Sequence, residues 1–111
     1  MNAPYAVDQE RWSKMNIFDQ MGNIYSEVGR SFNARRNHND ADCRQAIGRA
    51  TDLFDATISV LNASKSPRSK EVLRAKEAYL TAIYDQTGQA EDDLGLERYF
   101  MQYAVAARLN K

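Results

Sequence analysis

Apolar residues recur at spacings of three and four along four segments of this chain, and this periodicity is the feature that most constrains its fold. Such spacing puts the apolar side chains on one face of an α-helix, whereas a half-buried strand needs strict alternation. No segment shows that alternation. The sequence therefore predicts an all-α protein. The four apolar stripes are Ile17, Met21, Ile24, Val28 and Phe32; Cys43, Ala46, Ile47, Ala50, Leu53, Phe54, Thr57, Ile58 and Leu61; Val72, Leu73, Leu80, Ile83 and Tyr84; and Leu96, Tyr99, Phe100, Tyr103, Ala104 and Ala107.

Capping residues stand where these helices should begin. Asn16 is a predicted N-cap of the first helix, and either Asn39 or Asp40 caps the second. Asparagine and aspartate favour this position because their side chains accept hydrogen bonds from free backbone amides. Ser66-Pro67 is a strong start signal for the third helix, since a hydroxyl at the cap is followed by proline at the first helical position. Three carboxylates at 91–93 favour the start of the fourth.

The loops between the four predicted helices are about three to five residues long, so neighbouring helices must lie antiparallel. We therefore expect an antiparallel up-down-up-down four-helix bundle. A chain of 111 residues has room for one such domain, which we place at residues 12–111. Residues 1–11 are predicted to be an N-terminal tail, with Tyr5 and Trp12 available to fix it to the bundle.

Residues that carry catalytic or metal chemistry are scarce. The chain has one histidine, His38, and one cysteine, Cys43. A zinc site or an acid–base centre needs several such groups to converge, so we expect no enzyme activity, no metal and no cofactor. His38 is predicted to be an exposed loop residue. A single cysteine fits a reducing cytoplasm, and no apolar run is long enough to span a membrane.

The last predicted helix is apolar on more than one side. Met101, Val105 and Ala106 point away from its core stripe, and the candidate interface on this helix is Met101, Val105 and Leu109. A helix that is apolar all round is normally buried all round, although a bundle leaves each helix one wet face. Either the N-terminal tail covers this surface or another subunit does, and the enrichment of methionine and aromatics in interfaces favours a homo-oligomer or another protein partner.

Two glycines lie beside the core face of the first helix. Gly22 and Gly29 are one heptad apart, and each costs roughly 1 kcal/mol relative to alanine inside a helix. Small residues let another backbone approach closely. This stripe is therefore either a second interface between subunits or a place of tight packing within the bundle, and the packing interpretation is the one we favour.

Charge is unevenly distributed in a chain whose formal net charge is zero. In the expected bundle, basic residues outnumber acidic ones at the end that holds residues 1–20, 57–76 and 104–111. This end is a candidate contact for RNA or DNA phosphates, a type of binding that weakens steeply with salt. The alternative is an ordinary solvated surface. The candidate contact residues are Lys65, Arg68, Lys70, Arg108 and Lys111.

Charged residues of opposite sign also stand three positions apart on the predicted helices. The pairs are Glu27 with Arg30, Arg49 with Asp52, and Arg74 with Glu77. Pairs at this spacing are usually surface ion pairs that stabilise a helix by about 0.2–0.5 kcal/mol. The alternative is a charge network shared between helices that fixes their register, and we favour surface ion pairs.

Several phrases of the sequence are familiar, among them Arg11-Trp12, the stretch 19–30 (Asp-Gln-Met-Gly-Asn-Ile-Tyr-Ser-Glu-Val-Gly-Arg) and the stretch 49–57 (Arg-Ala-Thr-Asp-Leu-Phe-Asp-Ala-Thr). They resemble an uncharacterised group of short prokaryotic helical proteins, which implies no known activity. In architecture the chain is similar to the ribosomal-RNA intervening-sequence (S23-type) bundles. That group includes accessory proteins of retroelements, which form rings and bind a reverse transcriptase and nucleic acid. The likeness to them is at the level of fold.

Overall fold

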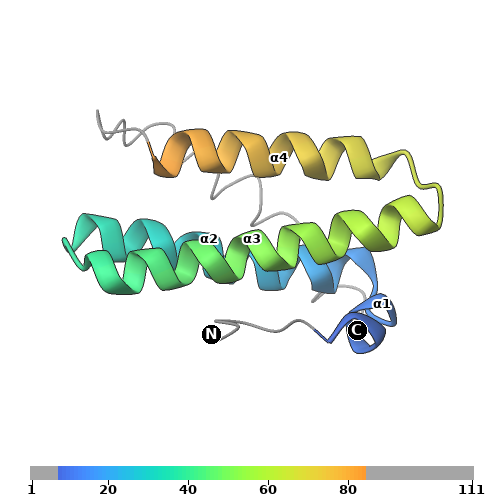
Figure 1. Cartoon of the computed structure of the whole chain (residues 1–111), viewed down its shortest axis with the longest axis horizontal. Helices are drawn as coiled ribbons and strands as arrows, with labels where there is room; N and C mark the ends of the chain where they lie inside the picture. Colours follow the sequence, from blue (N-terminus) through green and yellow to red (C-terminus); the bar gives the residue numbers. More distant parts are fainter. Residues whose placement is uncertain (1–7, 85–111) are drawn as a thin grey trace, which may run out of the picture.

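The computed structural model describes residues 8–84 of the chain. Helix accounts for 84% of these residues and no strand occurs among them, which confirms the all-α prediction. In Figure 1 the three long helices lie side by side, and the short first helix lies at one end of them. The elements are α1 (Gln9–Ser13), α2 (Ile17–Arg36), α3 (Asp40–Ala63) and α4 (Arg68–Ile83).

The predicted caps are confirmed at the starts of α2 and α3. The side chain of Asn16 accepts a hydrogen bond from the backbone amide of Asp19 at 2.8 Å. Asn39, rather than Asp40, caps α3 by accepting from the amide of Asp42 at 3.1 Å. At the start of α4 the predicted boundary is wrong by one residue, because Pro67 is the N-cap rather than the first helical residue, and the hydroxyl of Ser66 before it accepts from the amide of Arg68 at 3.2 Å. In all three places a side-chain oxygen satisfies an amide that has no partner inside the helix.

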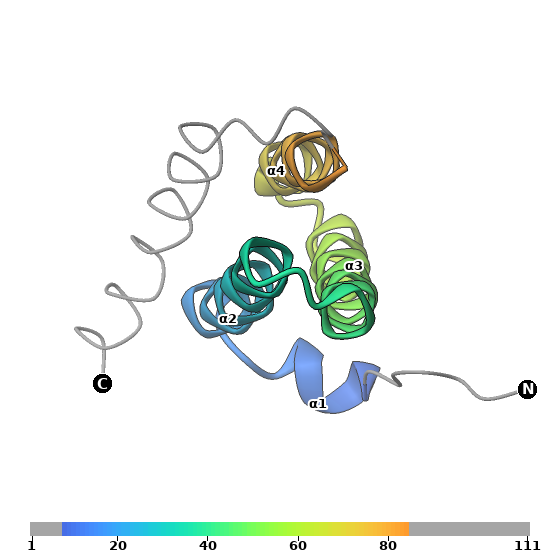
Figure 2. The same cartoon turned by 90° about the vertical axis from the view of Figure 1, so that its left-hand side faces the viewer.

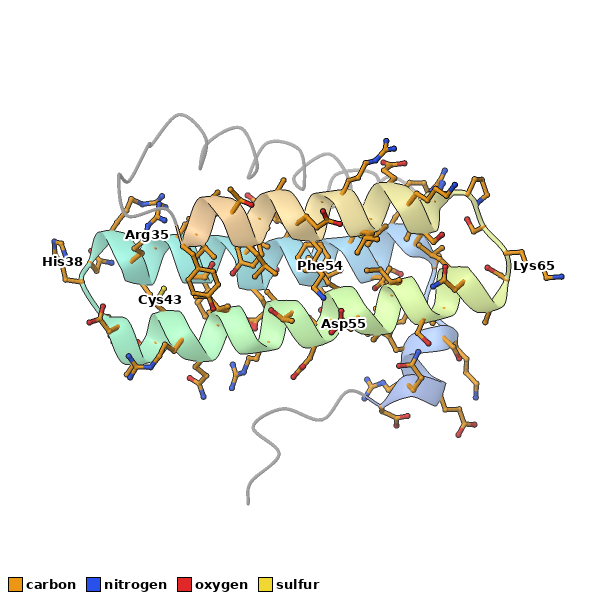
Figure 3. The ribbon with its side chains drawn as sticks, turned by 45° about the horizontal axis from the view of Figure 1, so that its top comes forward. Arg35, His38, Cys43, Phe54, Asp55 and Lys65 are labelled. Atoms are coloured by element: carbon orange, nitrogen blue, oxygen red, sulfur yellow. The ribbon has the colours of Figure 1, made fainter. Side chains whose placement is uncertain are left out.

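The two turns between the long helices share one geometry. Asn39 donates its amide to Ala34 O and His38 donates to Arg35 O, and the same two-bond pattern closes α3 through Ser66 and Lys65. This is the Schellman motif, which needs a residue in the left-handed region, usually glycine. His38 (φ 58°) and Lys65 (φ 56°) occupy that position here. Figure 3 shows these two residues at opposite ends of the molecule.

Replacing His38 by glycine is expected to stabilise the protein. A side chain at positive φ crowds the next carbonyl, and glycine removes that cost while losing more freedom on folding. We expect the free energy of unfolding to rise by about 0.5–1 kcal/mol, measured by urea denaturation. His38→Ala is the matched control, since it removes the imidazole but keeps the Cβ, and it should leave stability nearly unchanged. A lower stability for His38→Gly would show that the imidazole, not the backbone, determines stability at this turn.

The core lies where the three long helices meet. The fully buried side chains of α2 include Met21, Ile24, Val28 and Phe32, as its predicted stripe requires. The centre of the core is aromatic. The ring of Tyr79 on α4 packs edge-on against Phe32 of α2, with centroids 5.8 Å apart, and lies 5.9 Å from Phe54 of α3. One side chain of α4 therefore contacts both of the other long helices.

The predicted stripe of the third helix is wrong at two positions. Leu73 is 42% exposed and Tyr84 is 66% exposed, although both were expected to face the core. The buried side chains of α4 are instead Val72, Ala75, Tyr79 and Ile83, which again follow a helical spacing. The core position belongs to Tyr79 because Ser31 gives its hydroxyl a buried hydrogen-bond partner, which allows the whole ring to be buried.

Helix α1 differs from the tail that the sequence suggested for residues 1–11. It begins at Gln9 because the side chain of Asp8 caps it, accepting from the amide of Arg11 at 3.1 Å. Trp12 anchors it, being buried with its indole N–H donated to Thr57 Oγ1 at 2.9 Å. In the end-on view of Figure 2, α1 lies beside α2 and α3, on the side away from α4.

The remaining organisational predictions concern residues beyond this range. The predicted fourth helix, with its core stripe and its outer apolar residues, lies outside the described residues, as do residues 1–7. Within the described part of the chain, none of the helices has the length and apolar character needed to cross a membrane.

Candidate functional site

His38 and Cys43, the side chains best suited to catalysis or metal binding, do not form a site together. His38 is exposed in the turn after α2, while Cys43 lies further in on α3 and is half-buried (Figure 3). Burial raises the pKa of the Cys43 thiol, although the nearby Arg35 opposes this. The thiol is therefore held away from the reactive thiolate form. Among residues 8–84, no three His, Cys, Asp or Glu side chains are grouped so as to hold a metal ion.

Arg35 has a structural role at the same end of the molecule. Its Nη1 donates hydrogen bonds to the carbonyl oxygens of Ala82 at 2.8 Å and Ile83 at 3.1 Å. Its guanidinium also lies over the Phe32 ring, 5.1 Å from the centroid. A cation at the last carbonyls of a helix satisfies groups without an internal partner and complements the helix dipole. Arg35 thereby fixes the end of α4 against the end of α2.

Hydrogen bonds between buried polar side chains join the long helices. The Tyr79 hydroxyl donates to Ser31 Oγ at 2.7 Å, and the Ser31 hydroxyl donates in turn to Val28 O at 2.7 Å. Burial raises the pKa of Tyr79 far above its usual value, so the phenol stays neutral and serves as a donor. Both hydroxyls therefore donate a hydrogen bond inside the core. A buried polar network whose groups have partners is typical of a contact that fixes the register of two helices, here α2 and α4.

A second polar contact fixes α1. The side-chain amide of Gln20 on α2 is buried and donates to Trp12 O at 2.8 Å and Met15 O at 3.2 Å. It therefore adds a second partner to Trp12 O, which already accepts the amide of Met15, and binds Met15 O in the turn between α1 and α2. The apolar stripe gave no indication of Gln20, because the groups it binds are set by the path of the connecting turn.

An ion pair links α3 to α4, and a second carboxylate of α3 is partly removed from solvent. Lys76 of α4 bonds the exposed Asp55 of α3 at 2.6 Å. Burial, with a smaller contribution from the charge of Asp55, raises the pKa of Asp52. A shallow groove of about 480 Å³ lies between α1 and α3 and contains one carboxylate, Glu10; its lining is Gln9, Glu10, Ser13, Ser59, Val60, Ala63 and Ser64. These groups do not converge on a common point with an acid–base partner.

The structure brings three of the five candidate phosphate contacts together. Lys65, Arg68 and Lys70 are all exposed at the turn into α4, and Figure 3 shows Lys65 at the tip of this end. The guanidinium of Arg68 lies 5.9 Å from the centroid of the half-buried Phe18 ring, which restricts where its charge points. The other two candidates, Arg108 and Lys111, lie outside the described residues.

Gly22 and Gly29 both lie half-buried on α2. A Cβ built on Gly29 would meet nothing within 4 Å, so close packing within the described bundle does not require glycine there. The other candidate interface residues, Met101, Val105 and Leu109, lie outside the described residues.

Alanine at Gly29 is expected to raise the free energy of unfolding by about 1 kcal/mol, because alanine loses less backbone entropy in a helix. Gly48→Ala on α3 is the matched control, since Gly48 is exposed and its Cβ also meets open space. Urea denaturation measures both. A loss of stability in Gly29→Ala but not in Gly48→Ala would show that another segment of backbone packs closely against Gly29.

The outer face of α4 combines apolar and charged residues. Leu73 and Tyr84 are its large exposed apolar side chains. Among the predicted i,i+3 pairs, Glu27–Arg30 forms at 3.1 Å. Arg74 and Glu77 are both exposed and make no ion pair within the described part of the chain. This face therefore carries apolar surface together with two unused charges of opposite sign.

Comparison of the chain with protein-family models, with curated proteins and with solved structures finds no match.

Proposed function

We propose that this chain is a non-catalytic helical-bundle adaptor that associates with copies of itself in the cytoplasm. The observation that carries this proposal is the outer face of α4, where Leu73 is 42% and Tyr84 66% exposed. Single exposed apolar residues are common, but Leu73 and Tyr84 lie on the same side of α4, beside the exposed Arg74 and Glu77, and we interpret this combination as a contact surface. Buried polar side chains such as those of Gln20, Ser31 and Thr57 are engaged in structural bonds, which favours a binding role over a catalytic one.

The bundle itself is proposed to be antiparallel, in an up-down-up-down order completed by residues 91–109. The turns that follow α2 and α3 lie at opposite ends of the molecule (Figure 1). Arg35 holds the end of α4 beside the end of α2. A chain returning from that point would run along the bundle and place its apolar stripe, from Leu96 to Ala107, against the other helices. Its outer residues Met101, Val105 and Leu109 would then add a second apolar surface.

Light scattering tests the self-association directly. The wild-type chain is expected to show a mass above that of the 12.6 kDa monomer. Charged substitutions then locate the contact: Leu73→Glu tests the α4 face and Val105→Glu tests the predicted fourth helix. Arg44→Glu, on the exposed side of α3, is the control that changes charge elsewhere. A wild-type monomer at about 100 µM would contradict the proposal.

A second candidate function, that of a nucleic-acid accessory module, is favoured by the basic end. Lys65, Arg68 and Lys70 are exposed together, and clustered cations bind phosphates by releasing condensed counterions. The resemblance to intervening-sequence bundles is in line with this alternative. Binding of labelled RNA across a salt series tests it. Lys65→Glu should weaken the binding and reduce its salt dependence, and no binding at about 50 mM salt would contradict it.

A further inference from the structure

We propose that the outer face of α4 pairs with the same face of a second copy, with the two α4 helices antiparallel about a two-fold axis. This inference rests on the proposed self-association and specifies the surface that carries it. The surface is defined as the exposed or half-buried residues Leu73, Arg74, Glu77, Ala78, Leu80 and Tyr84, and is called the α4 face below.

The helical register separates the α4 face from the core. Leu73, Leu80 and Tyr84 stand seven and four residues apart, so they share one side of the helix. The buried residues Val72 and Tyr79 precede Leu73 and Leu80 by one position, which turns them about 100° away around the helix axis. Leu73 and Tyr84 therefore lie outside the core on this side of the helix, whereas Leu80 between them is half-buried and also packs against the core.

The charges on the α4 face suit a copy of itself. In a two-fold antiparallel pair, the residues that meet have numbers with a constant sum. An axis passing between Ala75 and Lys76 brings Arg74 opposite Glu77 of the second copy, and symmetry repeats this pair. The two charges that find no partner within the described residues would thereby neutralise each other across the interface.

The exposed apolar residues do not set this register. Leu73 is level with Ala78 of the second copy and Tyr84 with Pro67, but the members of each pair lie about 100–140° apart around the helix axis and do not face each other directly. The charge pair near the axis therefore determines the register, in which no like charges are opposed.

The size of this contact indicates a weak, reversible dimer. One pair of helices of this length buries less than the roughly 1,200 Å² at which stable complexes begin. The fraction of dimer is therefore expected to depend on concentration. The Arg74–Glu77 ion pairs, which lie near the axis, should strongly affect the dimer dissociation constant. Added salt should weaken the dimer because exposed ion pairs are screened.

A charge-reversal cycle tests the pairing. Sedimentation velocity over a concentration series gives the dimer dissociation constant for wild type, Arg74→Glu, Glu77→Arg and the double variant. Each single reversal is expected to weaken association about tenfold, because symmetry puts two like-charge pairs in the interface. The double variant restores opposite charges and should return to within about threefold of wild type. All these residues are exposed, so folding should be unaffected, which circular dichroism checks. Arg44→Glu again controls for net charge.

The outcomes separate this inference from the proposed function. A wild-type chain that associates but is insensitive to both single reversals would overturn the α4 pairing and leave self-association standing, with Val105→Glu then identifying the other surface. Single variants that dissociate without recovery in the double variant would also overturn it, since the two charges would not face each other. A monomeric wild type would overturn both proposals.

Discussion

Replacing Tyr79 by alanine is expected to lower the free energy of unfolding by about 3–5 kcal/mol, which is the cost of deleting a large buried aromatic side chain. The ring is fully buried between Phe32 and Phe54, so its removal leaves a cavity where the three long helices meet. A small domain of this kind is stable by only about 5–15 kcal/mol. The variant should therefore be partly unfolded near physiological temperature, as measured by circular dichroism and urea denaturation.

Tyr79→Phe separates the hydroxyl from the ring. It keeps the aromatic contacts but removes the donor to Ser31 Oγ, so it should cost only about 1–2 kcal/mol. Tyr84→Ala, on the same helix but 66% exposed, is the matched control and should change stability by less than about 0.5 kcal/mol. Equal losses for Tyr79→Ala and Tyr84→Ala would contradict the assignment of Tyr79 to the centre of the core.

Thr57→Val is expected to cost about 1–3 kcal/mol, although valine has nearly the same shape as threonine. The Thr57 hydroxyl accepts the indole N–H of Trp12 at 2.9 Å in a buried position. In Thr57→Val the indole N–H has no hydrogen-bond partner in the apolar interior. Detachment of α1 from α3 exposes the indole to water and costs the least free energy. Trp12 is the only tryptophan of the chain, so its fluorescence reports on α1 alone. We expect a red shift at denaturant concentrations that leave the long helices intact.

Thr51→Val provides the matched control for that prediction. The Thr51 hydroxyl donates only to Ile47 O of its own helix, at 2.8 Å, and its loss leaves no group of another helix unsatisfied. The expected change in stability is small, and the tryptophan emission should stay as in wild type. A red shift in Thr51→Val as large as that in Thr57→Val would mean that α3 as a whole, rather than the Trp12–Thr57 contact, determines how α1 is held.

The sequence predicted those features of the fold that depend on local spacing. The stripes of α2 and α3 and the caps at Asn16 and Asn39 follow from helical periodicity and from the chemistry of free backbone amides, both of which act over a few residues. The positions of buried polar groups could not be found in this way. Ser31 and Tyr79 are 48 positions apart, and neither spacing nor composition reveals that they meet.

The candidate surfaces were predicted less completely than the fold. The exposure of Lys65, Arg68 and Lys70 follows from their place at a helix start, and the structure agrees with it. Leu73 and Tyr84 were assigned to the core because apolar residues at helical spacing usually are buried. A helix with apolar residues on two sides offers two such stripes, and only the positions of α2 and α3 decide which one is covered. The predicted Arg74–Glu77 ion pair is absent from the described part of the chain, because i,i+3 spacing permits an ion pair without requiring one.

The central claim, that this bundle associates with copies of itself, is tested most directly by sedimentation equilibrium of the unmodified chain over a concentration series. The account predicts a weight-average mass that rises from 12.6 kDa toward a multiple of that value as concentration increases, with the rise displaced to higher concentration by added salt. A mass that stays at 12.6 kDa up to the highest soluble concentration would contradict it, and the exposed face of α4 would then have to be explained by a different partner.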